Sequence, residues 1–323
     1  MKKKLIVIVS LVIWMFGCSP QVHLDFLGKD TLQEVVLIKS PAKEKILLLD
    51  VSGVISTSLN QGLFAREGDI LSKVFYRLEK VSEDKAVKAV ILRLDTPGGE
   101  VTASDIIYNE ILRFKEKTRI PVVGLMMGVA ASGGYYIGSA CDFIVAHPST
   151  ITGSIGVISI FPNLEELFSK IGIKVNVIKS GEMKDSGSIF RDMTEDEKRV
   201  FQDVVDELYT KFLDVVYQKR KDAISLEDLK KIADGRIYTA SQALELKLID
   251  EIGYFDTALK KALSLASLRD ANVVAYTYYP TKKTNIYATS FNEPSLLESK
   301  SIEDMLRSLK SGFYYLWLPQ ISR

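Results

Sequence analysis

The chain has 323 residues, of which 47% are hydrophobic, and its 42 basic side chains nearly balance 41 acidic ones. This apolar content is enough for a domain with a buried core, which excludes a mainly disordered chain. A formal net charge of +1 gives no overall field that favours nucleic acid, so we expect no nucleic-acid partner. Two cysteines are too few for a disulfide framework, and Cys141 is expected to be a small core residue.

The first 18 residues have the layout of a secretory signal peptide. Three lysines precede a mostly apolar run from Leu5 to Phe16, which is shorter than the roughly 20 residues of a membrane-spanning helix. Cys18 follows Gly17 as in a bacterial lipoprotein signal. We therefore expect an exported protein that a lipid on Cys18 anchors to the extracytoplasmic (periplasmic) side of the membrane. Bulky residues before Gly17 leave an uncleaved short anchor as the alternative.

After a polar tether at 19–40, strand patterns alternate with helix patterns through a domain at 41–280, which is typical of an α/β fold. Strands are predicted at 46–51, 87–95, 121–127, 142–146, 174–180 and 272–278. Helices are predicted at 69–83, 103–117, 131–140, 163–171, 195–221, 226–233, 240–247 and 255–266. The tail at 281–323 ends in an aromatic segment that we expect to dock on the body or on a neighbouring subunit.

Three glycine-rich turns, at 95–101, 128–136 and 150–157, each follow a predicted strand. None has the spacing of a dinucleotide-binding or phosphate-binding loop. Each alone is explained as a tight turn in which glycine tolerates a positive φ. Together the three turns are also compatible with a catalytic site, because Gly98 and Gly99 can expose backbone amides. Ser132 opens a predicted helix whose dipole favours developing negative charge. The turns thus suit a serine nucleophile with an oxyanion hole.

A serine hydroxyl needs a base that takes its proton. His23 lies in the tether and His147 ends a strand without an orienting carboxylate, so neither is a convincing base. A lysine can serve if burial lowers its pKa below the usual value of about 10.4. Lys184 suits this best because it lies in a glycine- and serine-containing loop after a predicted strand, where its amine can turn inward. Spacing alone favours a solvated surface lysine.

Several ordered motifs resemble those of the bacterial signal peptide peptidase family of serine proteases, over residues from Ile46 to about Phe255. These are RLDTPGGEV, MGVAASGGYYIGSACD, TITGSIGV, SGEMKDSGS and DGRIYTASQALELKLIDEIG. The resemblance implies a single catalytic α/β domain with a Clp/crotonase-like spiral of ββα units. It implies no metal and no organic cofactor.

The resemblance also implies the roles of individual residues. The serine of the family's ASGGYY motif is the nucleophile, here Ser132, and the lysine of its SG-x-x-KD motif is the general base, here Lys184. Ser154 is implied to orient the lysine, and the backbone amides of Gly99 and Gly133 are implied to form the oxyanion hole. Hydrophobic peptides such as cleaved signal peptides are the implied substrates, and a ring-like or dome-like homo-oligomer is the implied assembly.

Two other functions stay open. A crotonase-like acyl-CoA enzyme also holds an oxyanion with two backbone amides, but coenzyme A is cytoplasmic and that chemistry gives no reason to pair Ser132 with Lys184. A non-catalytic lipoprotein can use the same fold to bind peptides or to assemble. The presence of Ser132, Lys184 and Ser154 argues against this scaffold function.

Overall fold

The computed structural model describes residues 32–57, 70–278, 285–287 and 312–317. The predicted signal peptide with Cys18, part of the tether and most of the tail lie outside the described residues. Among the helices that the structure describes, none is long and apolar enough to cross a membrane.

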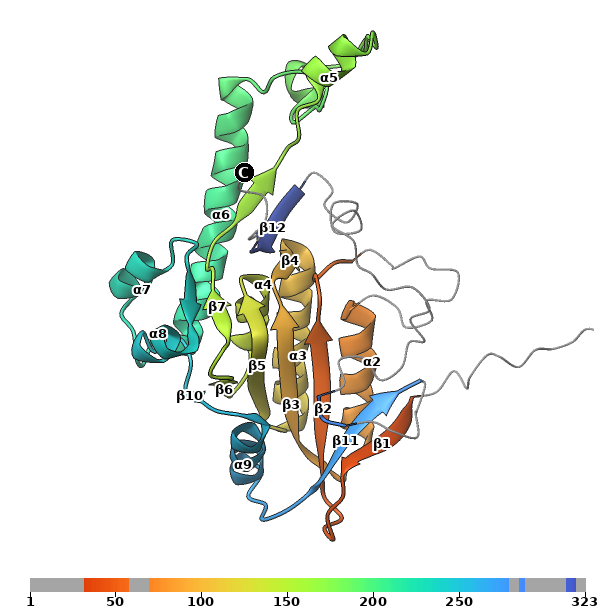
Figure 1. The fold of residues 1–323 in the computed structure, drawn as a ribbon, viewed down its shortest axis with the longest axis vertical. Helices are drawn as coiled ribbons and strands as arrows, with labels where there is room; N and C mark the ends of the chain where they lie inside the picture. Colours follow the sequence, from red (N-terminus) through yellow and green to blue (C-terminus); the bar gives the residue numbers. More distant parts are fainter. Residues whose placement is uncertain (1–31, 58–69, 279–284, 288–311, 318–323) are drawn as a thin grey trace, which may run out of the picture.

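A mixed β-sheet forms the centre of the body (Figure 1). Its main path consists of β1 (Gln33–Ile38), β11 (Asn272–Thr277), β2 (Lys45–Ser52), β3 (Val87–Thr96), β5 (Val122–Ala131), β6 (Phe143–Ala146) and β10 (Glu251–Ile252), in that order. Strands β2, β3, β5 and β6 are parallel neighbours. Beyond the end of β6, β7 (Ile151–Gly153) pairs with β5, and β9 (Ile237–Thr239) pairs with β7. The α/β class predicted from the sequence is confirmed.

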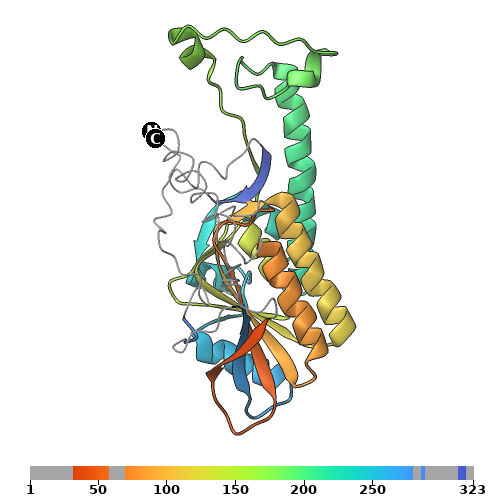
Figure 2. The same cartoon turned by 90° about the vertical axis from the view of Figure 1, so that its right-hand side faces the viewer.

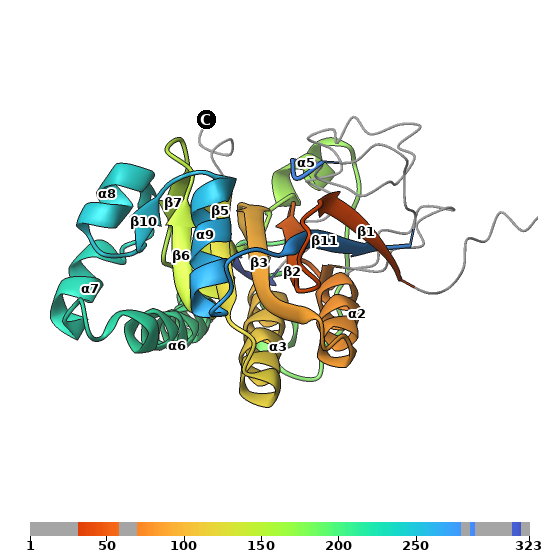
Figure 3. The ribbon, with the colours of Figure 1, turned by 90° about the horizontal axis from the view of Figure 1, so that it is seen from below.

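Helices cover both faces of this sheet (Figures 2 and 3). The helices that the structure describes, not all of which lie on the sheet, are α2 (Ile70–Glu83), α3 (Val101–Thr118), α4 (Gly133–Gly138), α5 (Glu165–Lys170), α6 (Glu195–Arg220), α7 (Leu226–Ile232), α8 (Ala240–Glu245) and α9 (Phe255–Leu265). Side chains alternate between the faces of a strand, so Ile46 and Leu48 of β2 pack with the α9 cluster. Leu47 and Leu49 pack in the cluster that includes α2, α3 and α6. Burial on both faces explains the continuous apolar strands.

A projecting arm, residues 158–200, extends from the body and contains β8 (Ile158–Ile160), α5 and the start of α6 (Figures 1 and 2). A capping box of Thr194 and Glu197 begins α6, as predicted. The strand predicted at 174–180 is wrong, because this segment is irregular and exposed. A strand needs a neighbour with which to pair, and the described residues offer this segment none. Its apolar side chains include Ile178, which is fully exposed.

Several strands form where the sequence predicted none, and two of them lie in the expected tether and tail. β1 lies inside the expected tether and pairs antiparallel with β11. From the tail, β12 (Gly312–Leu316) pairs antiparallel with β4 (Gly98–Glu100) on one side and with β8 on the other. The aromatic end of the chain is therefore packed on its own body, next to the first glycine-rich turn.

Candidate active site

Ser132 lies between the end of β5 and the first residue of α4. Its side chain is buried, and its backbone has φ 54° and ψ −115°, a conformation that favours glycine. Its N–H donates to the carbonyl oxygen of Gly153 at 2.8 Å, and its carbonyl oxygen accepts from the N–H of Tyr136 at 2.9 Å. A strained residue persists only where its surroundings fix it, and such residues cluster at functional sites.

This strain makes a prediction about stability. We expect Ser132→Gly to raise the free energy of unfolding by about 1 kcal/mol, because glycine adopts this conformation without strain. Ser132→Ala keeps the β-carbon and is expected to give no such gain. Urea unfolding of both variants measures the difference. A glycine variant no more stable than the alanine variant would show that the backbone at Ser132 is not strained.

Ser154 lies beside Ser132 because the strands before them are paired. In the parallel pair of β5 and β7, Ala131 is opposite Gly153, so the next residue of each strand leaves the sheet at the same place. Ser154 also has a positive φ, 49°, and its N–H donates to the carbonyl oxygen of Arg236 at 2.8 Å. The structure therefore places together two of the serines that the sequence singled out.

The turn at Gly98 touches the residue that follows Ser132. A β-carbon on Gly98 would lie 2.6 Å from the backbone nitrogen of Gly133 and 2.0 Å from the carbonyl oxygen of Tyr315, so no larger residue fits. Gly98 also has a φ of +98°, and its N–H donates to Oγ1 of Thr96 at 3.1 Å. The two segments expected to supply oxyanion-hole amides are thus in direct contact.

The amide of Gly99 faces β12. On the other side of β4, the carbonyl oxygen of Gly98 accepts from the N–H of Ile55 at 2.9 Å, and the N–H of Glu100 donates to the Ile55 carbonyl oxygen at 2.8 Å. Hydrogen-bonding groups alternate along a strand, so the N–H of Gly99 points the opposite way, where Tyr315 pairs with it. An extended peptide that adds to β4 would use this same edge.

Lys184 is not beside these residues. It lies in the 3₁₀ turn η1 (Glu182–Asp185), which is in the arm next to the start of α6, whereas Ser132 lies in the body. The lysine is exposed, and its side chain forms no hydrogen bond or ion pair with any residue that the structure describes. The expectation that the amine turns inward is not met within a single chain, because the loop projects into solvent.

Other reactive side chains lie in ordinary structural settings. Nδ1 of His147 is 2.8 Å from Oγ of Ser149, and the ring packs edge-on against Tyr254. Cys141 is a core residue as predicted, and burial raises the pKa of its thiol to about 12. Within the described ranges, no group of three His, Cys, Asp or Glu side chains could hold a metal ion.

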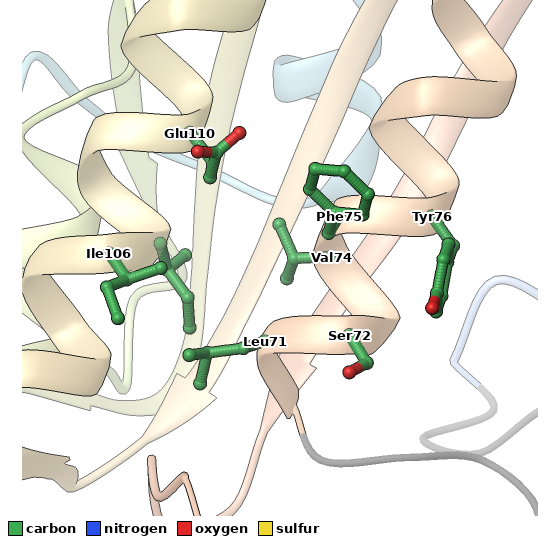
Figure 4. A pocket seen from close by; sticks show the side chains of 8 residues that line it. Leu71, Ser72, Val74, Phe75, Tyr76, Ile106 and Glu110 are labelled. Carbon is green, nitrogen blue, oxygen red and sulfur yellow. The ribbon is translucent and has the colours of Figure 1, made fainter.

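A surface pocket between α2 and α3 lies apart from these residues (Figure 4). Its lining is mostly apolar and includes Leu71, Val74, Phe75 and Ile106, with Glu110 at one side. None of the residues singled out for catalysis lines it. It offers no nucleophile with a base.

A buried serine with a strained backbone, next to the glycine-rich turn at Gly98, is the arrangement expected of a serine hydrolase. Residues 114–269 match the model of peptidase family S49. The chain is 38% identical to the putative signal peptide peptidase SppA of Enterococcus faecium, over 78% of this chain and 72% of that protein. It is 37% identical to a putative protease of Synechocystis sp., over 71% and 77% respectively.

A third relative is the chloroplastic serine protease SPPA of Arabidopsis thaliana, which is 32% identical over 72% of this chain and 33% of its own length. The chain belongs to peptidase family S49 and is a member of the signal peptide peptidase family. It is therefore a serine protease, and the acyl-CoA enzyme weighed as an alternative has no support.

Proposed function

We propose that this protease is an exported, membrane-anchored endopeptidase that hydrolyses hydrophobic peptides such as cleaved signal peptides. Ser132 is the proposed nucleophile and Lys184 the proposed general base. The observation that carries the proposal is the strained, buried Ser132 beside Ser154 and the contact between Gly98 and Gly133. The Enterococcus relative, named as a signal peptide peptidase, supports the substrate class.

In the proposed reaction, the neutral amine of Lys184 takes the proton of the Ser132 hydroxyl as Oγ attacks the scissile carbonyl carbon. The amide of Gly133 donates to the oxyanion that forms, and the amide of Gly99 joins it when the substrate takes the place of β12 on β4. The proton then passes to the leaving amine. Water, activated by the same lysine, hydrolyses the acyl-enzyme. Ser154 is proposed to hold the lysine amine by a hydrogen bond. A Clp/crotonase-like spiral is the fold that we propose for the complete domain.

The proposed base must come from a second copy of the chain, because the arm holds Lys184 away from Ser132 in its own chain. We therefore propose a homo-oligomer in which the arm of one subunit reaches the serine of its neighbour. Exposed apolar side chains on the arm support an interface there. They are Leu167, Ile171, Ile173, Val175, Val177 and Ile178. That interface would also remove the lysine amine from water, as a general base requires.

Mixing two inactive variants tests this proposal. Ser132→Ala supplies intact lysines and Lys184→Ala supplies intact serines, so a mixed oligomer contains sites with both. Random mixing of equal amounts is expected to restore about one quarter of wild-type peptide hydrolysis, since half of the serines are intact and half of these meet an intact lysine.

The matched control mixes Ser132→Ala with the double variant Ser132→Ala/Lys184→Ala, which contains no intact serine and is expected to stay inactive. Native mass spectrometry verifies that the subunits exchange. Mixed oligomers without hydrolysis would show that the serine and the lysine do not act together across subunits.

A further inference from the structure

The turn that carries Lys184 has no apolar core beneath it. None of the residues of η1 is buried. Its backbone is closed by the N–H of Lys184, which donates to the carbonyl oxygen of Gly181 at 3.1 Å, and by Oγ of Ser186, which donates to the Met183 carbonyl oxygen at 2.7 Å. A short exposed turn with so few packing contacts opens easily unless other groups hold it. What fixes Lys184 must therefore be polar.

Arg191 stabilises the turn by binding Asp185, the residue after Lys184. Its Nη2 donates to Oδ1 of Asp185 at 2.7 Å and its Nε donates to Oδ2 at 3.0 Å, which is a two-point contact between planar groups. The same Nη2 lies 3.3 Å from the Asp185 backbone carbonyl oxygen. Guanidinium is suited to this geometry, and a lysine in its place would make only a point contact.

Glu197 ties the guanidinium to the start of α6. Arg191 Nη1 donates to Glu197 Oε2 at 3.0 Å, and Nη2 donates to Oε1 at 2.5 Å. The Glu197 side chain is only 1% exposed, and it also accepts the N–H of Thr194 at 2.8 Å in the capping box. A continuous chain of contacts therefore runs from a 26-residue helix to the residue after Lys184.

The charges in this cluster stay constant over the pH range in which a lysine base works. Arg191 and the Thr194 amide lower the pKa of Glu197 to about 2, and Arg191 with Lys179 also lowers the pKa of Asp185. Lys179 closes the turn from the other side, since its Nζ donates to Asp185 Oδ1 at 2.7 Å and to the Glu182 carbonyl oxygen at 2.9 Å. The two carboxyl groups protonate only in strong acid, so the ion pairs of the cluster stay formed at the pH at which the enzyme works.

We propose that Arg191 is a positioning residue for catalysis, which fixes the turn of Lys184 to the rigid start of α6 by joining Asp185 to Glu197. This inference rests on the proposed role of Lys184 as the base. The contacts of Arg191 are to Asp185, Asp192 and Glu197, not to Ser132 of its own chain, and it acts through the direction in which the lysine side chain leaves the turn. It also neutralises the Asp185 carboxylate, which would otherwise favour the charged form of the neighbouring lysine.

Steady-state hydrolysis of a fluorogenic hydrophobic peptide by the full chain in detergent tests this inference. Arg191→Gln is expected to lower kcat about 10- to 100-fold with KM changed less than about twofold, because a small misplacement of a catalytic group slows chemistry more than binding. The acid limb of the kcat/KM profile is expected to move to higher pH, since Lys179 alone then offsets the charge of Asp185 and Glu197, and the remaining negative charge stabilises the protonated lysine. Arg191→Lys is expected to recover part of kcat.

Arg199→Gln is the matched control, because Arg199 also pairs with a carboxylate, Asp196, on the first turns of α6 but faces solvent. It is expected to leave kcat and the pH profile unchanged. Wild-type kinetics for Arg191→Gln, while Lys184→Ala is inactive, would overturn the inference and leave the proposed function intact. A fall in kcat with an unchanged pH profile and a smaller oligomer by light scattering would also overturn it. Full activity of Lys184→Ala would instead overturn the proposed function.

Discussion

Replacing Ser132 with alanine is expected to lower peptide hydrolysis by about four orders of magnitude or more, since loss of the nucleophile in serine proteases has an effect of that size. Its Oγ has no hydrogen-bond partner among the described residues, so its removal takes nothing from the fold. Lys184→Ala is expected to have a similar effect on kcat, because an unassisted hydroxyl is a poor nucleophile. Hydrolysis of a fluorogenic hydrophobic peptide by the full chain measures both losses.

Cys141→Ala is a useful control for this experiment, since its thiol is buried away from any proposed role and the variant is expected to retain activity. Equal rates for the wild-type protein, Ser132→Ala and Lys184→Ala would contradict the proposed mechanism. Peptide binding without turnover in all three would favour the non-catalytic scaffold.

The largest expected effect on stability comes from Tyr315→Ala in β12. The Tyr315 side chain is fully buried, and its ring stacks on Tyr136 with centroids 5.0 Å apart and packs against Phe212 at 4.6 Å. Its hydroxyl donates to the Leu208 carbonyl oxygen at 3.0 Å. Removal of such a ring is expected to lower the free energy of unfolding by about 3–5 kcal/mol. Urea unfolding with two spectroscopic probes measures the loss.

Two variants calibrate that result. Tyr315→Phe removes only the hydroxyl and is expected to lose about 1 kcal/mol. Tyr287→Ala removes an exposed ring and is expected to change stability by less than about 0.5 kcal/mol. If Tyr315→Ala were as stable as Tyr287→Ala, β12 would not be part of the folded body.

The sequence correctly predicted the strands that are buried on both faces of the sheet. The runs from Ile46 to Leu49 and around Val90 are apolar throughout because helices cover both faces of the sheet, and a continuous run reports that burial directly. The same reasoning failed at 174–180, because an apolar run looks alike whether it is buried in its own chain or exposed on an arm. β12 could not be predicted as a strand of the body, since its partner β4 lies far earlier in the chain.

Some residues of the candidate site could also be predicted from the sequence, and others could not. Gly98, Gly133 and Ser132 were accessible to prediction because glycine-rich turns after parallel strands meet at one edge of the sheet. The position of Lys184 was not, because a sequence does not say whether a loop packs on its own body or projects from it. The cluster that Arg191 forms with two carboxylates was not predicted from the sequence, although the regular spacing of these residues could have indicated it. Asp185, Arg191 and Glu197 recur every six residues and surround the start of a capped helix.

The positive φ angles of Ser132 and Ser154 bear on how this chain has been selected. Both positions suit glycine, so mutational drift under selection for folding alone would replace serine at each of them and leave a more robust body. A non-catalytic scaffold gives no reason for serine at two positions that suit glycine, whereas the proposed mechanism uses both hydroxyl groups. The backbone strain at Ser132 and Ser154 therefore favours the catalytic proposal over the scaffold.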